Sequence, residues 1–171
     1  MDFDLDIDTG DHLGPMAARP RNFVVVVDDS AESRLALRFA TARAGHVEGG
    51  GIILFHAIPP GDFQHWVAVA EQLREEEREQ ARMLLEEAAG KIYAYSGVKP
   101  EIVIRDGNPK EELLDFMQER DDLFALILAS SASGEPGPLI EYFSGPLVAN
   151  LPCPLVVIPG SLQPETIDKL A

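Results

Sequence analysis

Short apolar runs alternate with longer amphipathic segments through most of this sequence. The runs are rich in valine, isoleucine and leucine, which is typical of strands buried on both faces of a sheet. They span residues 23–27, 52–55, 101–105, 123–128 and 155–158. Between them, apolar residues recur at helical spacing. Strands that alternate with helices predict βαβ units and a parallel sheet covered on both faces, so the predicted fold class is α/β.

The segment from about residue 63 to residue 89 carries the longest helical pattern. Glutamate and arginine lie three residues apart along one side of it, which indicates a solvated face. The opposite stripe is apolar except at Glu77 and runs through Trp66, Ala70, Leu73, Ala81, Leu84 and Ala88. This stripe predicts the face that packs on the sheet.

Local signals mark where other helices begin or break. Asp29 and Glu32 fit a capping box for the helix that follows the first strand. Asn108 before Pro109 predicts the start of a later helix, since proline suits the first helical position. The Gly-Pro pair at 145–146 should interrupt the last predicted helix, because proline removes a backbone donor.

The two ends of the chain differ from its middle. Near the N-terminus, aspartates at 2, 4, 6, 8 and 11 alternate with Phe3, Leu5 and Ile7. An added edge strand would fit this alternation, but charge repulsion favours a mobile acidic tail over residues 1–21. A calcium loop is excluded, because Thr9 and Pro15 stand where an EF-hand needs glycine and glutamate. The predicted domain spans 22–160, and 161–171 form a C-terminal tail.

Charge and cysteine content exclude several classes of function. Fourteen Lys and Arg face 29 Asp and Glu in the 171 residues, for a net charge of −15. This balance argues against nucleic-acid binding and against docking on anionic membranes. One cysteine, Cys153, excludes an internal disulfide, and no Cys/His cluster has metal-ligand spacing. With no signal sequence and no apolar run long enough to cross a bilayer, we expect a cytoplasmic protein.

Ligands of open parallel sheets bind outside the carboxyl ends of the strands, where the strand order reverses. The turns that follow the first four predicted strands are therefore the candidate sites. They cover residues 28–30, 56–60, 106–108 and 130–138.

One reading of these turns is a response-regulator receiver. Asp28 and Asp29 resemble its acidic pair, and Ser130 resembles its switch hydroxyl. That resemblance fails after the last strand, where a receiver needs a lysine and this chain has Pro159-Gly160-Ser161. The receiver-like phosphoacceptor is therefore disfavoured.

Five motifs in order resemble the universal stress protein family over about residues 21–160. The first strand leads into a D-x-S-x-x-S turn, and small residues follow on the first helix. The second strand ends in His-Ala, a G-N-P turn follows the third, and the last strand lies in a proline-flanked run. In this sequence they are Asp28-x-Ser30-x-x-Ser33, Ala36 and Ala40, His56-Ala57, Asp106-Gly107-Asn108-Pro109 and Leu151–Pro159. The long acidic helix and the Gly134–Leu139 loop resemble the single-domain proteobacterial branch.

The resemblance implies a Rossmann-like three-layer sandwich with the parallel strand order 3-2-1-4-5. It also implies a homodimer that pairs through the last strand, and an apolar edge strand of this kind favours pairing on physical grounds. The expected antiparallel contact is formed by Leu155, Val156, Val157 and Ile158.

The resemblance implies that ATP-binding members of the family carry a motif of the form G-x2-G-x9-G-[ST] after the fourth strand. Its glycines let backbone amides approach phosphates. This chain has Ala129, Ala132, Tyr142 and Phe143 at those positions, and a shifted Gly134-x2-Gly137 remains. No Lys or Arg lies between Arg120 and Lys169. These departures argue against strong ATP binding.

A nucleotide pocket, if formed, would draw on eleven residues of these turns. They are Asp28, Asp29, Ser30, His56, Ala57, Gly107, Ser130, Ser131, Ser133, Gly134 and Gly137. Asp28 would then hold an adenine or ribose edge by resemblance, although Asp28 and Asp29 could equally cap the first helix. His56 is expected to be a hydrogen-bonded structural histidine.

The sequence therefore predicts a regulatory, non-catalytic stress-response module with a protein partner of unknown identity. The alternative is a switch that binds ATP or AMP with Mg²⁺ and hydrolyses ATP slowly or not at all. No catalytic residue and no protein metal site is predicted.

Overall fold

The computed structural model describes residues 20–61 and 67–171 of the chain. Residues 1–19 of the predicted acidic tail lie outside the described residues, and so does Trp66. In chain order the elements are β1 (Arg21–Val26), α1 (Ala31–His46), β2 (Gly50–Ile58), α2 (Val67–Ser96), β3 (Glu101–Asp106), α3 (Pro109–Gln118), β4 (Leu123–Ala129), α4 (Pro138–Ser144), the 3-10 helix η2 (Pro146–Asn150), β5 (Leu155–Ile158) and α5 (Pro164–Leu170).

The strands form one parallel sheet in the order β3-β2-β1-β4-β5, which confirms the expected topology. In the central strand, Phe23 is in register with Ile52 of β2 on one side and Ala125 of β4 on the other. The chain builds β2 and β3 outward from β1 and then crosses back to add β4 and β5. The strand order therefore reverses between β1 and β4, and a crevice is expected at the carboxyl ends of these two strands.

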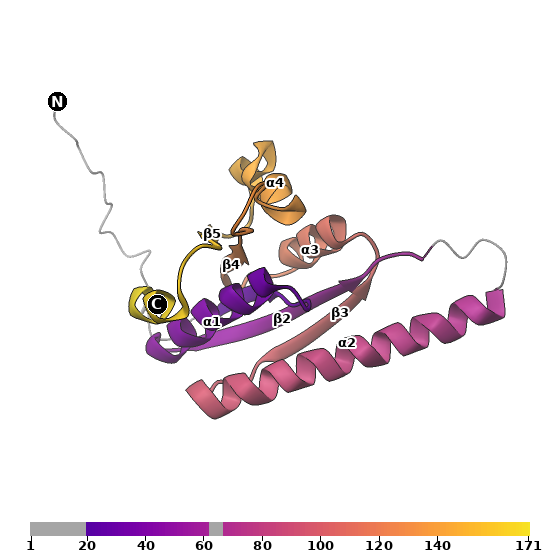
Figure 1. Ribbon diagram of the computed structural model, residues 1–171, viewed down its shortest axis with the longest axis horizontal. Helices are drawn as coiled ribbons and strands as arrows, with labels where there is room; N and C mark the ends of the chain where they lie inside the picture. Colours follow the sequence, from indigo (N-terminus) through magenta and orange to yellow (C-terminus); the bar gives the residue numbers. More distant parts are fainter. Residues whose placement is uncertain (1–19, 62–66) are drawn as a thin grey trace.

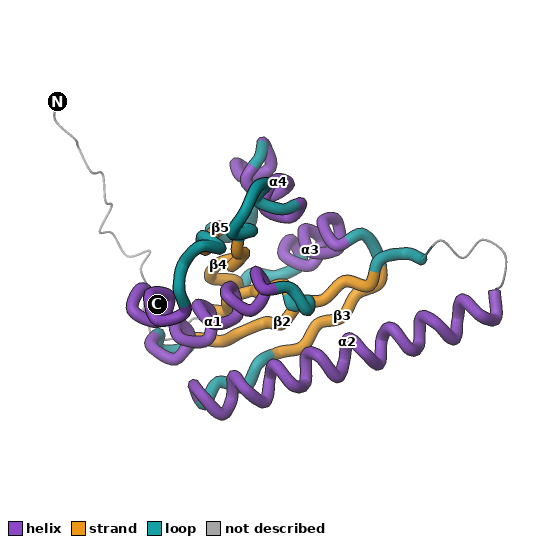
Figure 2. The backbone as a smooth tube through the Cα atoms, viewed as in Figure 1, coloured by secondary structure: helices purple, strands orange, loops and turns teal. Residues whose placement is uncertain are grey.

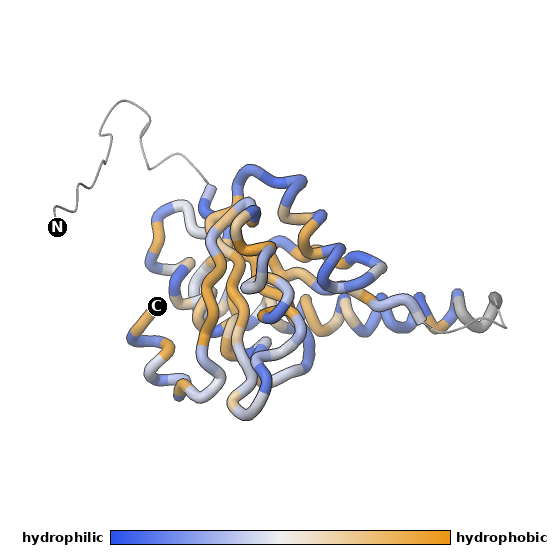
Figure 3. Tube along the Cα trace, turned by 90° about the horizontal axis from the view of Figure 1, so that it is seen from above, coloured by the Kyte–Doolittle hydropathy of each residue, from blue (hydrophilic) through white to orange (hydrophobic). Residues whose placement is uncertain are grey.

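Helices cover both faces of the sheet (Figure 1 and Figure 2). Buried residues of α1, α2 and α5 pack on one face, around Val25, Leu54 and Ile127. Buried residues of α3 and α4 pack on the other face, around Ile53 and Leu126. The strands between these layers are coloured as hydrophobic in Figure 3, as expected for a sheet buried on both sides.

The boundaries of the long helix differ from the prediction. Helix α2 runs to Ser96, seven residues past the predicted end at 89. It packs through Ala81, Leu85, Ala88 and Ile92, whereas the described residues 71–80 are exposed apart from the half-buried Leu73. Of the described members of the predicted stripe, Ala81, Leu84 and Ala88 pack in or against the core. Leu73 is only half-buried and Glu77 is exposed, because α2 projects past the sheet towards its start (Figure 1).

The break at 145–146 is confirmed, since α4 ends at Ser144 and η2 begins at Pro146. After β5, the segment treated as a C-terminal tail forms α5, whose Ile167 is fully buried in the core. Within residues 20–61 and 67–171, no helix combines the length and the apolar character that crossing a bilayer requires.

Candidate functional site

A cavity of about 290 Å³, which we call the switch-point cavity, lies where the strand order reverses. Its walls come from the ends of β1 and β4, the start of α1 and the loop before α4. The residues that line it are Val26, Asp28, Ser30, Glu32, Ser33, Ala36, Ile127, Leu128, Ala129, Ser131, Pro136, Gly137, Pro138, Leu139 and Ile140. The cavity thus lies at the position predicted from topology, and its walls are mainly apolar.

The turn from β1 into α1 is closed by its own hydrogen bonds. Ser30 is the N-cap of α1, and its hydroxyl accepts from the Ser33 amide over 3.0 Å. The Ser33 hydroxyl donates to the Val26 carbonyl and accepts from the Asp28 amide, both over 3.1 Å. Asp28 in turn accepts from the Ser30 amide over 2.8 Å. The D-x-S-x-x-S motif therefore has a structural role as a strand-to-helix turn.

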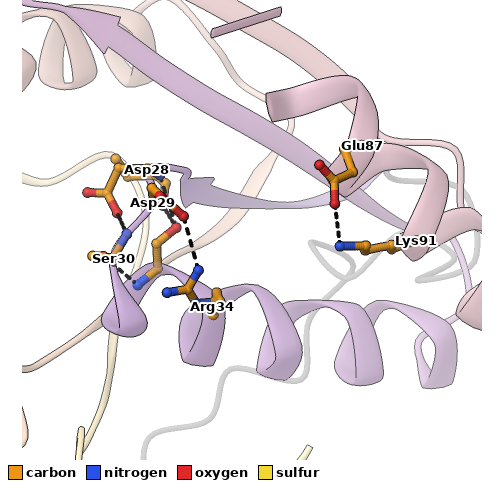
Figure 4. A network of polar contacts seen from close by, with 8 residues as sticks. Asp28, Asp29, Ser30, Arg34, Glu87 and Lys91 are labelled. Atoms are coloured by element: carbon orange, nitrogen blue, oxygen red, sulfur yellow. Dashed lines mark hydrogen bonds and ion pairs between the residues drawn. The ribbon is translucent and has the colours of Figure 1, made fainter. Parts of the chain in front are cut away.

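Asp29 does not cap α1, so the predicted capping box is wrong in register by one residue. Its side chain is 90% exposed and forms an ion pair with Arg34 over 3.0 Å (Figure 4). The cap shifts to Ser30 because its hydroxyl is placed to accept from Ser33. Asp29 is not among the residues that line the cavity, so only Asp28 of the acidic pair contributes to its wall.

Three backbone donors of the loop after β4 are engaged within the protein. The Ser130 amide donates to the Ile158 carbonyl over 2.9 Å, and the Ser131 amide donates to the Pro136 carbonyl over 3.4 Å. The Ser133 amide donates to the Ser131 hydroxyl over 3.3 Å. These three amides are engaged by the protein itself and are not free to bind a ligand.

The ionisable residues of the cavity wall are acidic. Asp28 and Glu32 line the cavity, and no lysine or arginine is among its lining residues in the described part of the chain. Glu135 is exposed in the adjacent loop. An anion placed here would meet carboxylates without a compensating cation.

The structure does not bring the other predicted site residues together in one place. Ser131 and Gly137 join Asp28 and Ser30 at the cavity, while Gly107 lines a smaller hollow of about 160 Å³ beside Arg74 and Asp106. Ala57 is buried in the core of the α3 face. Ser130, Ser133 and Gly134 belong to the loop after β4 but do not line the cavity.

His56 has a structural partner. Its Nδ1 lies 2.7 Å from the Val27 carbonyl, which ties the end of β2 to the end of β1. A carbonyl cannot donate, so the geometry requires the proton on Nδ1. This contact matches the expected structural histidine.

The apolar wall of the cavity was not predicted from the sequence. Ala36, Leu139 and Ile140 line it, together with the two prolines that flank Gly137. Their positions follow from how α1 and α4 dock beside β4, which spacing along the chain does not reveal.

A model of the universal stress protein family matches residues 20–159. The chain belongs to this family. No curated protein matches the sequence. Among solved structures, the universal stress protein UspA from Lactobacillus plantarum is 21% identical with a TM-score of 0.67, over 82% of this chain and 99% of that one.

Two further similar structures contain adenine nucleotides. A universal stress protein from Archaeoglobus fulgidus in complex with dAMP is 21% identical with a TM-score of 0.57, over 81% of this chain and 97% of that one. An Arabidopsis thaliana protein of the family with AMP bound is 18% identical with a TM-score of 0.58, over 82% of this chain and 92% of that one. At these identities the likeness establishes the fold.

In this universal stress protein the residues at the two last motif positions pack in the core or against it. Phe143 is fully buried in the core of the α3 face, and Tyr142 meets it edge-on with ring centroids 5.0 Å apart. Lys110 lies over the Tyr142 ring at 5.6 Å. A glycine and a hydroxyl residue there would remove this packing, so the departure from the ATP-binding pattern is part of the core.

Proposed function

We propose that this chain is a non-catalytic regulatory module of the universal stress protein family that does not hold a triphosphate at its switch-point cavity. The observation that carries the proposal is the state of the loop after β4. Three of its amides bond within the protein, and Pro136 and Pro138 have no N–H to offer. At most the amides of Ala132, Gly134, Glu135 and Gly137 are then left in residues 130–138 to bind a polyphosphate.

Electrostatics supports the same proposal. The cavity presents Asp28 and Glu32, and the loop adds Glu135. A nucleoside triphosphate carries several negative charges, so its approach to these carboxylates is unfavourable unless a bound cation intervenes. The size of the cavity and its apolar wall suit a small ligand with little charge, such as a nucleoside.

The non-catalytic part of the proposal rests on the described ionisable groups. His56 is bonded to a carbonyl, and Cys153 lies in the core of the α3 face. Burial raises the pKa of the Cys153 thiol, which disfavours the thiolate that a nucleophile requires. Neither group lines the cavity.

The second candidate function is binding of an adenine nucleotide with one phosphate. Family structures with AMP and dAMP favour it, because they share this fold. In such a complex, Asp28 would accept from the ribose or adenine, and Mg²⁺ would offset the charge of the neighbouring carboxylates.

Thermal unfolding with added ligand separates the two candidates. We expect no change in the melting temperature with millimolar Mg-ATP, whereas AMP at a hundred times its Kd would add about 2.7 kcal/mol if it bound. The Arabidopsis protein with AMP in its structure serves as the positive control. A melting shift with Mg-ATP would contradict the proposal.

A cavity-filling variant locates any ligand that does bind. Leu139 is half-buried in the cavity wall, and Leu139→Trp would occupy the space. A shift with AMP or adenosine that this variant abolishes would assign the ligand to the switch-point cavity. A shift that survives would place the ligand elsewhere.

We also propose that two copies pair through β5. This strand lies at one edge of the sheet, and Val157 is 38% exposed there. An apolar edge with unpaired backbone groups favours strand pairing with a second copy.

A further inference from the structure

A second groove, of about 350 Å³, lies on the opposite side of α1 from the switch-point cavity. Helices α1 and α2 form its walls, and α5 closes one side. Its apolar part consists of Leu37, Ala88 and Ile92, and Tyr95 stands beside them with 71% of its surface exposed. The exposed ring of Tyr95 extends the apolar surface of the groove.

Cations gather at this groove in a chain that is otherwise strongly acidic. Its lining residues include Arg34, Arg38 and Lys91 but only one acid, Asp168. Figure 4 shows Arg34 on α1 and Lys91 on α2. Three of the fourteen lysines and arginines of the chain thus lie around one groove, whereas the switch-point cavity has carboxylates.

The partners of these cations hold them with different strength. Arg38 is fixed by Asp168 through two bonds of 2.7 and 2.6 Å. Arg34 and Lys91 are 66% and 75% exposed, in ion pairs with side chains that lie outside the groove. Exposed pairs of this kind contribute little stability, so both cations can exchange partners at small cost.

We propose that residues 2–8 of this chain dock in this groove. In an extended conformation, Phe3, Leu5 and Ile7 lie on one face of the segment and the aspartates lie on the other. The apolar face would cover the half-buried Leu37 and the exposed ring of Tyr95. The aspartates are then within reach of the long Arg34 and Lys91 side chains at the rim.

The chain between this segment and β1 is long enough. Residues 9–20 form the connection, and when extended they span about 40 Å. The Arg21 amide bonds to the Gly49 carbonyl, directly after α1, and Thr41 of the groove lies five residues before His46 at the end of α1. Five helical residues rise only about 8 Å. A tethered segment also acts at a high effective concentration, which favours docking within one molecule.

A spin label tests this docking in the full-length protein. The label is attached at Thr9→Cys, just beyond the docking segment. Cys153 is buried, so it is shielded from the reagent, and wild-type protein treated in parallel checks this. We expect loss of amide NMR signal for residues 34–41 of α1 and 88–95 of α2, and retained signal for α3 on the opposite face.

A pair of charge variants and one double variant separate the contributions of charge and apolar contact. Lys91→Glu should restore the lost signals, whereas Lys99→Glu, an exposed residue outside the groove with the same change in charge, should leave them lost. Leu5→Ser with Ile7→Ser should restore the signals with the aspartates unchanged. Added salt should restore them in part, because salt screens exposed charges.

Three results would overturn the proposal. One is signal loss confined to residues next to the start of β1, and another is loss centred on a different face. The third comes from a further experiment, in which spin-labelled protein is mixed with unlabelled, isotope-enriched protein. Signal loss at the groove seen only in that mixture would show that a second copy, and not the chain's own N-terminal segment, occupies it.

Discussion

The amide of Gly160 donates a hydrogen bond to the Ser130 hydroxyl over 3.1 Å. This bond joins the turn after β5 to the loop after β4, beside the switch-point cavity. The backbone of Gly160 passes so close to Ser130 that a Cβ at this position would meet the Ser130 carbonyl and the Ala132 amide. Only glycine therefore fits at position 160. The turn after β5 thus packs directly against the loop after β4, which could contact a ligand.

Gly160→Ala should destabilise the protein by about 1–3 kcal/mol, because the added methyl forces the two backbones apart. Gly90→Ala is the matched control. Gly90 lies exposed within α2 with nothing near its Cβ position, so alanine should stabilise by about 0.5–1 kcal/mol. Denaturant unfolding measures both. Equal effects of the two substitutions would contradict the close approach.

Ser33→Ala should cost about 1–2 kcal/mol of unfolding free energy. The hydroxyl of this 7% exposed residue bonds to both Val26 and Asp28, and its loss leaves a carbonyl and an amide short of a partner. Ser161→Ala changes an exposed serine in a turn and should have almost no effect. Comparable costs for the two would mean that the turn is not held by Ser33.

The two edges of the sheet offer a matched test of dimer formation. Val157 on β5 and Ile102 on β3 are 38% and 36% exposed, at opposite edges. Val157→Asp should convert the proposed dimer into monomers, because it places one carboxylate from each copy close to the contact between the two β5 strands. Ile102→Asp should leave the dimer intact. Light scattering after size-exclusion chromatography measures the mass, and a monomeric wild-type protein would exclude the dimer.

Asp122 should make the stability depend on pH. Hydrogen bonding from Arg120 lowers the pKa of this carboxyl, and Asn22 also donates to it over 2.7 Å. A lowered pKa in the folded state adds stability above the ordinary pKa, and this stability is lost as the pH falls through the folded value. Asp122→Asn should therefore cost about 1–2 kcal/mol at neutral pH and progressively less in acid.

Unfolding of the wild type and of Asp122→Asn across this acid range measures the difference between them. The control is Asp121→Asn, which makes the same change in charge at the exposed neighbouring residue. If the difference in unfolding free energy between wild type and Asp122→Asn stays constant down to strongly acid pH, the ion pair of Asp122 with Arg120 does not cause the pH dependence.

Local sequence signals were sufficient for the framework of this fold. The run 52–55, for example, is a continuous isoleucine- and leucine-rich segment, and its burial in β2 follows from composition alone. Asn108 before Pro109 predicted the start of α3, and the structure confirms Asn108 as its N-cap. These features depend on neighbours a few residues apart, so a linear sequence contains the information.

Features that depend on contacts between distant segments were decided by the tertiary structure. The cap moved from Asp29 to Ser30 because Ser33 also reaches back to Val26. Over residues 71–96, helix α2 is buried at Ala81, Leu85, Ala88 and Ile92, where the sheet lies beneath it. The way the loop after β4 folds against β5 decides which predicted site residues share the cavity. It also decides whether the amides near Ser131 remain free, because a hydrogen-bond donor pairs with whichever acceptor the fold places within reach.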